Sequence, residues 1–426
     1  MQITIHRGID QIGGCIAEIA TDQARIIIDF GQNLPVGNNP PEDSFADKEA
    51  VIKLMDGVDA VLYTHYHGDH IGLFHLVPDS VKQYVGQTAK EVALCKHRKL
   101  AQIKGREEQS AIELRKLGQM YGFKALDEIE FGDIMVVPYF VSHSACDSYM
   151  FLIEADGKRI LHTGDFRGHG YLSKGLIPTI EKLILPGGKV DFLITEGTML
   201  SRMDENVRTE HEVQQHMKKL MRQYKNVFVL CSSTDMERLA SVYSANDAIQ
   251  NRPFVCNSYQ KEVLALFTAQ AKSPLFRFDK VYDFRKNNTK LLGWLQDKGF
   301  CMLVRTTPKY TDYVDFLNEE LGLNPDETVL IYSMWKEYIN PNSKHAKQDY
   351  LDFAALFKHI EKLHTSGHAS AEFLAEACNT VNPALGIIPI HSEVSGNFGQ
   401  LDISSDLKDR IVTTSKTIDG IRIEVK

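Results

Sequence analysis

The sequence lacks a long apolar run and a paired-cysteine motif. No stretch approaches the roughly 20 apolar residues that a membrane-spanning helix needs, and residues 1–7 reach a charge before the apolar core of a signal peptide could form. The seven cysteines are odd in number, scattered and free of any CxxC pair. That pattern is typical of reduced thiols rather than of a disulfide framework. We therefore expect a cytoplasmic protein without a membrane segment.

An excess of basic residues is also absent. The 48 basic and 56 acidic residues give a formal net charge of −8, whereas proteins that bind nucleic acid generally present a basic face. Any nucleic acid must therefore be held locally, by a groove and by metal ions. A length of 426 residues is sufficient for two domains, or for one domain with a large insertion.

Two patterns of predicted secondary structure divide the chain. The first 200 residues predict short β-branched strands bounded by Gly or Asp, with one or two surface helices over 89–121. From about 205 to 335, predicted helices and strands alternate, which is typical of a parallel βαβ sheet. The other expected features are links at 195–205 and 335–349, helices at 351–359 and 371–381, and a strand at 385–390.

The residues most indicative of chemistry follow the predicted strand over 60–64. Within six residues, the chain presents His65, His67, Asp69 and His70. Two histidines that lie two residues apart can bind one ion, and the Asp-His pair can bind a second ion at the roughly 3.5–4 Å separation of two-metal hydrolases. Neighbouring glycines permit a tight turn around the ions. A solvated polar loop is the alternative, but such a loop has no need of HxHxDH between an apolar strand and a glycine.

Two ions need further ligands, and later strand ends supply candidates. His143 follows the apolar run 134–141, and Asp165 closes the sequence His-Thr-Gly-Asp after another predicted strand. A carboxylate can bridge two cations, so Asp165 is the natural bridge. Asp29, at the end of a predicted strand, is expected to accept the second N–H of a ligand imidazole. Each residue alone is compatible with a simple turn, but the histidine cluster favours the ligand interpretation.

The ordered set of Asp29, the HxHxDH run, His143 and Asp165 resembles the metallo-β-lactamase superfamily. Three later residues narrow the resemblance to its β-CASP nucleases and especially to ribonuclease J. They are Glu196 in Ile-Thr-Glu-Gly-Thr, His368 in Ser-Gly-His-Ala-Ser and His391 in Pro-Ile-His-Ser. Only about 35 residues follow His391, so the resemblance is to a ribonuclease J without its C-terminal domain. Any homo-oligomer is then expected to form without that domain.

The resemblance implies a fold and an activity. The expected fold class is α/β, with a four-layered αββα metallo-β-lactamase domain made from residues 1–203 and 355–426. A parallel-sheet βαβ domain, the β-CASP domain, is inserted over residues 204–354. The implied activity is metal-dependent hydrolysis of phosphodiester bonds in RNA, expected to be single-stranded, with endonuclease and exonuclease modes both open. Two zinc ions are the expected cofactors because histidines with a bridging aspartate suit zinc, and manganese is the alternative.

The resemblance also implies roles for individual residues. Asp69, Glu196 and His368 are the candidate catalytic residues, with His368 acting as a general acid or assisting the scissile phosphate and Glu196 orienting it. The first ion would take His65, His67, His143 and Asp165, and the second would take Asp69, His70, Asp165 and His391. Three further positions hold a terminal 5′ phosphate in ribonuclease J, and they correspond to Ser233, His364 and Ser366. The alternative is that Ser233 is a loop or cap hydroxyl and His364 a structural histidine.

Two other functions remain open from the sequence. A metallo-β-lactamase-fold hydrolase of a small ester, lactone or thioester would need neither the Glu196 motif nor the His368 motif. A non-catalytic RNA-processing subunit would be expected to lose metal ligands, and this chain retains every one of them.

Overall fold

The computed structural model describes residues 1–39, 48–249, 251–412 and 421–424. The chain divides into two compact units. Unit 1 comprises Met1–Leu34, Pro41–Asn206 and Gly367–Lys426, and unit 2 comprises Pro35–Pro40 and Val207–Ser366. Among the helices of the described ranges, none is both long enough and apolar enough to cross a membrane.

Unit 1 contains two mixed β-sheets. The seven-stranded sheet has the order β19-β1-β2-β3-β4-β5-β6, and the six-stranded sheet has the order β18-β11-β10-β9-β8-β7. The strands of the first sheet are β1 (Gln2–Arg7), β2 (Ile16–Ala20), β3 (Arg25–Ile28), β4 (Ala60–Leu62), β5 (Lys82–Gly86), β6 (Tyr121–Phe123) and β19 (Ile421–Glu424). Those of the second are β7 (Ile129–Phe131), β8 (Ile134–Val141), β9 (Ser148–Ala155), β10 (Lys158–His162), β11 (Phe192–Glu196) and β18 (Gly386–Ile390).

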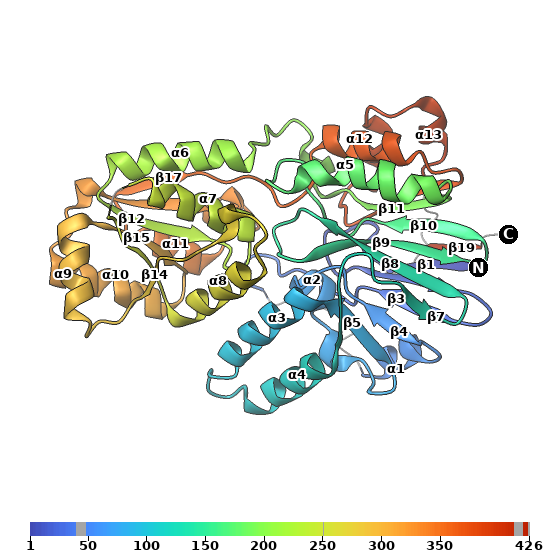
Figure 1. Cartoon of the computed structure of the whole chain (residues 1–426), viewed down its shortest axis with the longest axis horizontal. Coiled ribbons are helices and arrows are strands. Elements are labelled where there is room, and N and C mark those ends of the chain that lie inside the picture. Colours follow the sequence, from blue (N-terminus) through green and yellow to red (C-terminus); the bar gives the residue numbers. More distant parts are fainter. Residues whose placement is uncertain (40–47, 250, 413–420, 425–426) are drawn as a thin grey trace. The chain divides into compact units, whose positions relative to one another are not determined.

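The two sheets bury one face against each other, and helices cover the remaining faces (Figure 1). The helices beside the first sheet are α1 (Lys48–Met55), α2 (Gly68–Ile71), α3 (Gln87–Leu100) and α4 (Glu107–Gln119). Those beside the second are α5 (Leu176–Thr179), α12 (Ala371–Val381) and α13 (Ser405–Asp409). This arrangement confirms the predicted α/β class with αββα layers.

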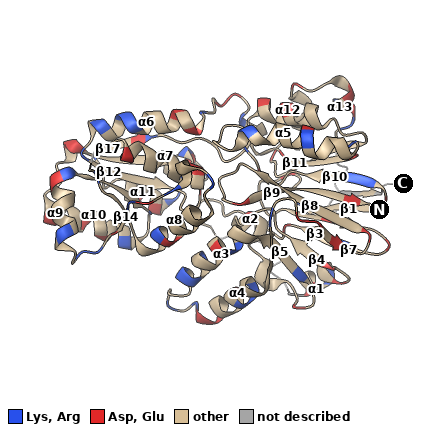
Figure 2. Cartoon of the chain, viewed as in Figure 1, with Lys and Arg blue, Asp and Glu red and all other residues tan. Residues whose placement is uncertain are grey.

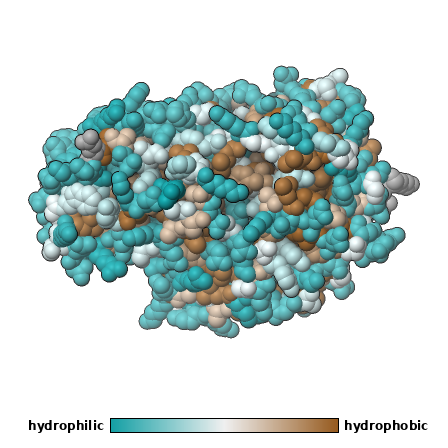
Figure 3. Space-filling view, viewed as in Figure 1, coloured by the Kyte–Doolittle hydropathy of each residue, from teal (hydrophilic) through white to brown (hydrophobic). Residues whose placement is uncertain are grey.

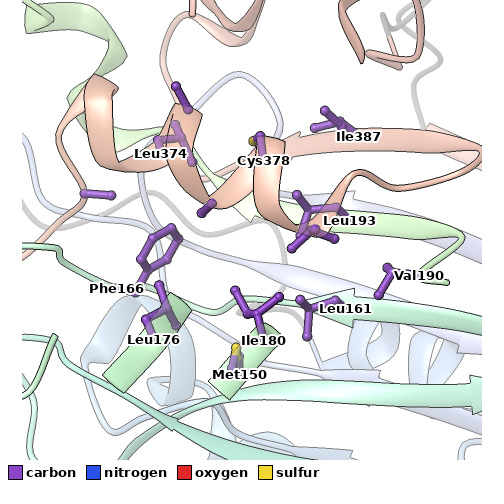
Figure 4. Close-up of a cluster of buried hydrophobic side chains, with 14 of the residues drawn as sticks. Met150, Leu161, Phe166, Leu176, Ile180, Val190, Leu193, Leu374, Cys378 and Ile387 are labelled. Atoms are coloured by element: carbon purple, nitrogen blue, oxygen red, sulfur yellow. The ribbon is translucent and has the colours of Figure 1, made fainter. Parts of the chain in front are cut away.

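Strand β9 shows how the layers are specified by sequence. Successive side chains of a strand point to opposite faces. Accordingly, Phe151 and Ile153 pack between the two sheets, whereas Met150 and Leu152 face the helical layer. Figure 4 shows this outer core, in which side chains of α12 lie over those of the six-stranded sheet. A strand buried on both faces therefore needs a nearly continuous apolar run, which β9 has.

Unit 2 is a parallel sheet with the order β14-β13-β15-β12-β16-β17. Its strands are β12 (Asn226–Cys231), β13 (Phe254–Cys256), β14 (Val281–Asp283), β15 (Phe300–Val304), β16 (Thr328–Ser333) and β17 (His359–Lys362). Its helices are α6 (Glu210–Gln223), α7 (Met236–Asp247), α8 (Ser258–Gln270), α9 (Thr289–Lys298), α10 (Pro308–Leu321) and α11 (Gln348–Ala354). Strands β12 and β16 are buried at every position, as expected for the centre of a parallel sheet covered on both faces.

The surface carries both basic and acidic residues (Figure 2), as the composition of the sequence predicts. Helix α6 carries acidic residues in its first turn and a basic residue in its last turn (Figure 2). The face of the molecule seen in Figure 3 is largely hydrophilic with scattered apolar patches. Helix α6 begins with a capping box in which Thr209 and Glu212 bond each other's backbone N–H groups. Such a box satisfies donors that the first turn of a helix leaves free.

The expected boundary at residue 355 lies within unit 2, which extends to Ser366. The sequence pattern predicts a helix over 351–359, but α11 ends at Ala354 and residues His359–Lys362 form β17. Strand β17 pairs in parallel with β16 at the edge of the sheet. Because an edge strand is only partly buried, its charged and apolar residues do not form the apolar run that marks a central strand.

Candidate metal centre

The histidine-rich loop is held in place by the segment that follows β3. The N–H of Phe30 donates to the carbonyl of His70 over 2.8 Å, and the N–H of Gln32 donates to the carbonyl of Gly68 over 2.9 Å. At Gly31, which stands between Phe30 and Gln32, an added Cβ atom would lie 1.8 Å from the carbonyl oxygen of Asp69. Only glycine permits this approach, so the segment packs directly against the backbone of the loop.

One cluster of ligand atoms consists of His65, His67 and His143. Nε2 of His143 lies 3.1 Å from Nδ1 of His67, close to the roughly 3.3 Å expected of two nitrogens at ~2.0–2.1 Å from one tetrahedral zinc ion. Nε2 of His65 is buried and has no hydrogen-bond partner. Burial holds the pKa of His65 and His143 well below the usual range and lowers the pKa of His67 to about 4. All three are therefore neutral imidazoles, the form that binds a metal.

Asp165 lies between this cluster and a second one. Its Oδ2 atom is 3.9 Å from Nε2 of His143, 3.1 Å from Nε2 of His70 and 3.6 Å from Nε2 of His391. Nε2 of His391 is also 3.2 Å from Oδ2 of Asp69. Burial opposes ionisation of Asp165, but His391 and His70 outweigh it and hold the pKa of this carboxyl well below its usual range. One anionic oxygen is therefore shared by the two groups of ligand atoms.

Asp29 lies behind His70, where it orients the imidazole. Oδ2 of Asp29 is 2.7 Å from Nδ1 of His70, and Oδ1 accepts the backbone N–H of Thr64 over 2.7 Å. Burial lowers the pKa of His70, but Asp165 and Asp29 raise it more, so that it lies well above its ordinary value. With Nδ1 engaged, Nε2 faces the ligand cluster, where it lies 3.1 Å from Oδ2 of Asp165. A carboxylate on the far nitrogen is the usual support of a metal-binding histidine.

His368 and Glu196 form a pair at the edge of the centre. Nδ1 of His368 is 3.0 Å from Oε2 of Glu196 and 3.6 Å from Oδ2 of Asp165. Glu196 is fixed in turn, because its Oε1 accepts the N–H of Phe166 over 3.0 Å. Burial lowers the pKa of His368, but Glu196 and Asp165 outweigh it and raise the pKa above its ordinary value. The side chain of His368 is 20% exposed, so it can reach a substrate.

Two residues of this centre were not predicted from the sequence. The Oγ1 atom of Thr198 lies 2.7 Å from Nδ1 of His391 and 3.1 Å from Nδ1 of His368, and so links the two histidines. Cys15 offers a sulfur atom beside His70 and His391. The sequence Glu-Gly-Thr, which ends at Thr198, could have indicated the role of this threonine. The two glycines before Cys15 could have indicated that the chain turns tightly at this cysteine.

The comparisons with known proteins agree with this geometry. Residues 26–227 match a family model described as a beta-lactamase superfamily domain. An RNase J-like protein of Methanocaldococcus jannaschii is 27% identical over 205 residues, which are 47% of this chain and 44% of that protein. A ribonuclease J of Helicobacter pylori is 21% identical over 447 residues, which are 100% of this chain and 60% of that protein. The chain therefore resembles the metallo-β-lactamase superfamily, with the family model matching residues 26–227.

The resemblance to ribonuclease J within that superfamily is therefore confirmed, although the chain spans only about half of the length of these curated relatives. A crystal structure of a protein of unknown function from Enterococcus faecalis V583 has the same fold. It matches 99% of each chain with a TM-score of 0.71 and 21% identity. The folds of unit 1 and unit 2 thus occur together in one solved chain.

The three candidate phosphate-binding residues belong to unit 2. Ser233 follows the carboxyl end of β12, and His364 and Ser366 follow that of β17. Both strands flank β16 in parallel, so their carboxyl ends lie on one edge of the sheet, the edge at which parallel sheets commonly bind ligands. Nδ1 of His364 is 3.3 Å from Nη1 of Arg238, whose guanidinium also pairs with Glu210 at 2.8 Å.

Proposed function

We propose that this protein is a two-metal-dependent nuclease that hydrolyses phosphodiester bonds in RNA. The observation that carries the proposal is the position of Oδ2 of Asp165, within 3.9 Å of ligand nitrogens in both histidine clusters. A shared carboxylate between two sets of ligands is the arrangement that a two-metal hydrolase requires. The relatives named ribonuclease J and RNase J-like protein support RNA as the substrate. We also propose a cytoplasmic location.

The donor set fits two divalent ions. His65, His67, His143 and Asp165 would hold the first, and Asp69, His70, Asp165 and His391 the second. The buried Nε2 atom of His65 supports this assignment, because it has no hydrogen-bond partner among the described residues. When bound, such ions supply activation of water and neutralisation of phosphate charge. Neutral imidazoles with carboxylates favour zinc, and manganese is the alternative.

Side chains of the protein would supply the proton for the leaving group and orient the histidines. His368 would donate a proton to the leaving oxygen of the scissile phosphodiester, since its raised pKa favours the protonated imidazole. Glu196, 3.0 Å from Nδ1, would fix the orientation of the His368 ring. Asp29 would hold His70 in its metal-binding orientation.

The first test compares single-stranded RNA and DNA oligonucleotides of one sequence, together with a small chromogenic ester, in the presence of zinc or manganese. We expect the RNA to be cleaved and the other two substrates to be spared. The choice of RNA rests on the resemblance, in which the RNA-acting β-CASP branches carry histidine at the position of His391 and the DNA-acting branch carries valine. Faster cleavage of DNA contradicts the proposed substrate. Brisk hydrolysis of the ester without cleavage of RNA favours a small-molecule hydrolase, and binding of RNA without hydrolysis favours a non-catalytic subunit.

A second prediction concerns the 5′ end of the RNA. If Ser233, His364 and Ser366 bind a terminal phosphate, RNA with a 5′ monophosphate should be degraded faster than the same RNA with a 5′ hydroxyl. Ser233→Ala should reduce this preference, because a hydroxyl donor to the phosphate is lost. Ser258→Ala, at an exposed position of the same unit, is the control and should leave the preference unchanged. Equal rates on both RNAs in the unaltered protein would exclude the phosphate site.

A further inference from the structure

The loop between β1 and β2 carries Cys15 to the metal centre. Gly13 and Gly14 have φ values of +77° and +65°, a conformation that favours glycine. A Cβ atom on Gly13 would lie 2.8 Å from the Cβ of Asp69, so the loop lies directly against this residue. The backbone N–H of Cys15 then donates to the carbonyl of Asp69 over 3.1 Å. Cys15 is therefore tied to the segment that supplies four proposed ligands.

The thiol of Cys15 is enclosed together with two of those ligands. Cys15, His70 and His391 each offer one ligand atom, and these atoms lie within 4.8 Å of one another. All three residues are buried, with exposures of 2%, 1% and 0%. Gly8 also lies close to the thiol, since a Cβ atom on Gly8 would be 3.1 Å from the sulfur of Cys15. The carbonyl of Gly8 accepts the backbone N–H of His391.

These distances suit a shared ion. Zinc lies about 2.3 Å from a thiolate and about 2.0–2.1 Å from an imidazole nitrogen. At an approximately tetrahedral angle between two ligands, the sulfur and a nitrogen are separated by roughly 3.6 Å, which is less than the 4.8 Å within which the three ligand atoms lie. The two Nδ1 atoms are engaged by Asp29 and Thr198. The Nε2 atoms lie 3.1 Å from Oδ2 of Asp165 and 3.2 Å from Oδ2 of Asp69, so they face the carboxylates of the proposed second metal site.

We propose that Cys15 is a thiolate ligand of the second metal ion and makes that site selective for zinc over manganese. The proposal rests on the proposed two-metal function. As the ion binds, the S–H bond breaks, the proton passes to solvent and a metal–sulfur bond forms, with no change of oxidation state. Thiolate is a soft ligand that favours zinc, whereas manganese favours carboxylate and water oxygens.

Cobalt(II) provides a readout that does not depend on activity, because a thiolate bound to cobalt absorbs in the near ultraviolet and histidine or carboxylate ligands do not give that band. We expect the cobalt-loaded protein to show the band and Cys15→Ala to lose it while the visible bands of bound cobalt remain. Cys378→Ala is the matched control, because Cys378 is a buried thiol of α12 in the outer core. It should retain the band. Cys15→Ser replaces Cys15→Ala if thermal unfolding shows that the alanine variant is not folded.

Competition between zinc and manganese completes the test. The excess affinity for zinc should fall at least about tenfold in Cys15→Ala and stay unchanged in Cys378→Ala. A protein that binds two cobalt ions without the near-ultraviolet band overturns the role of Cys15 and leaves the two-metal proposal standing. Retention of the band in Cys15→Ala overturns that role in the same way. Failure of the unaltered protein to bind cobalt or zinc overturns the two-metal function and this inference with it.

Discussion

Asp165→Asn is expected to lower the metal content and to abolish hydrolysis of RNA together. Oδ2 of Asp165 lies 3.1 Å from Nε2 of His70 and 3.9 Å from Nε2 of His143, so one negative oxygen serves both ligand clusters. An amide has nearly the same shape but no charge, and it cannot offset two cations. Losing several kcal/mol of electrostatic stabilisation corresponds to a rate at least about 10³-fold lower. Metal analysis by plasma mass spectrometry, beside an RNA cleavage assay, measures both effects.

Asp406→Asn is the matched control for this change. Asp406 is an exposed residue of α13 that pairs with Arg410 on the surface, so its replacement should change neither metal content nor rate. An Asp165→Asn protein with two ions per chain and ordinary activity would show that Asp165 does not bridge. Loss of activity at full metal content would instead assign Asp165 a role in the reaction other than holding the ions.

The sequence allowed the layers of the fold to be predicted where a strand or helix has a regular apolar pattern. The alternation of helices and strands in unit 2 is an example, since its central strands are apolar throughout. Elements with weak patterns were not predicted. Strand β5 contains Lys82 and Gln83, and helix α9 carries Gly293 in its interior. Both are stabilised by tertiary contacts that local propensity does not express.

The candidate site likewise contains residues that the sequence predicts and residues that it does not. Ligands such as His65 and His67 can be predicted because two imidazoles two residues apart on one loop imply a shared ion. Thr198 and Cys15 reach the centre from other loops, and their positions depend on backbone geometry, including the positive φ values of Gly13 and Gly14. The φ of +52° at His391 is a related case. No spacing along the chain encodes such a conformation.

His368→Ala is expected to keep both ions and to lose about 10²–10⁴-fold in the rate of RNA cleavage, the usual effect of removing an acid–base group. The geometry separates His368 from the ligands, because its Nδ1 lies 3.0 Å from Glu196 and its side chain is 20% exposed, whereas His391 is fully buried. His211→Ala, at an exposed position of α6, is the matched control and should keep the full rate.

Glu196→Gln distinguishes proton donation from metal binding by His368. An amide still bonds the imidazole but no longer raises its pKa, so the rate should fall less than in His368→Ala while both ions stay bound. Asp165, Glu196, His368 and His391 nevertheless lie close enough together to hold an ion. If His368→Ala loses one ion, and its rate recovers at high zinc concentration, then His368 is a ligand. In that case the proton must reach the leaving oxygen from another group.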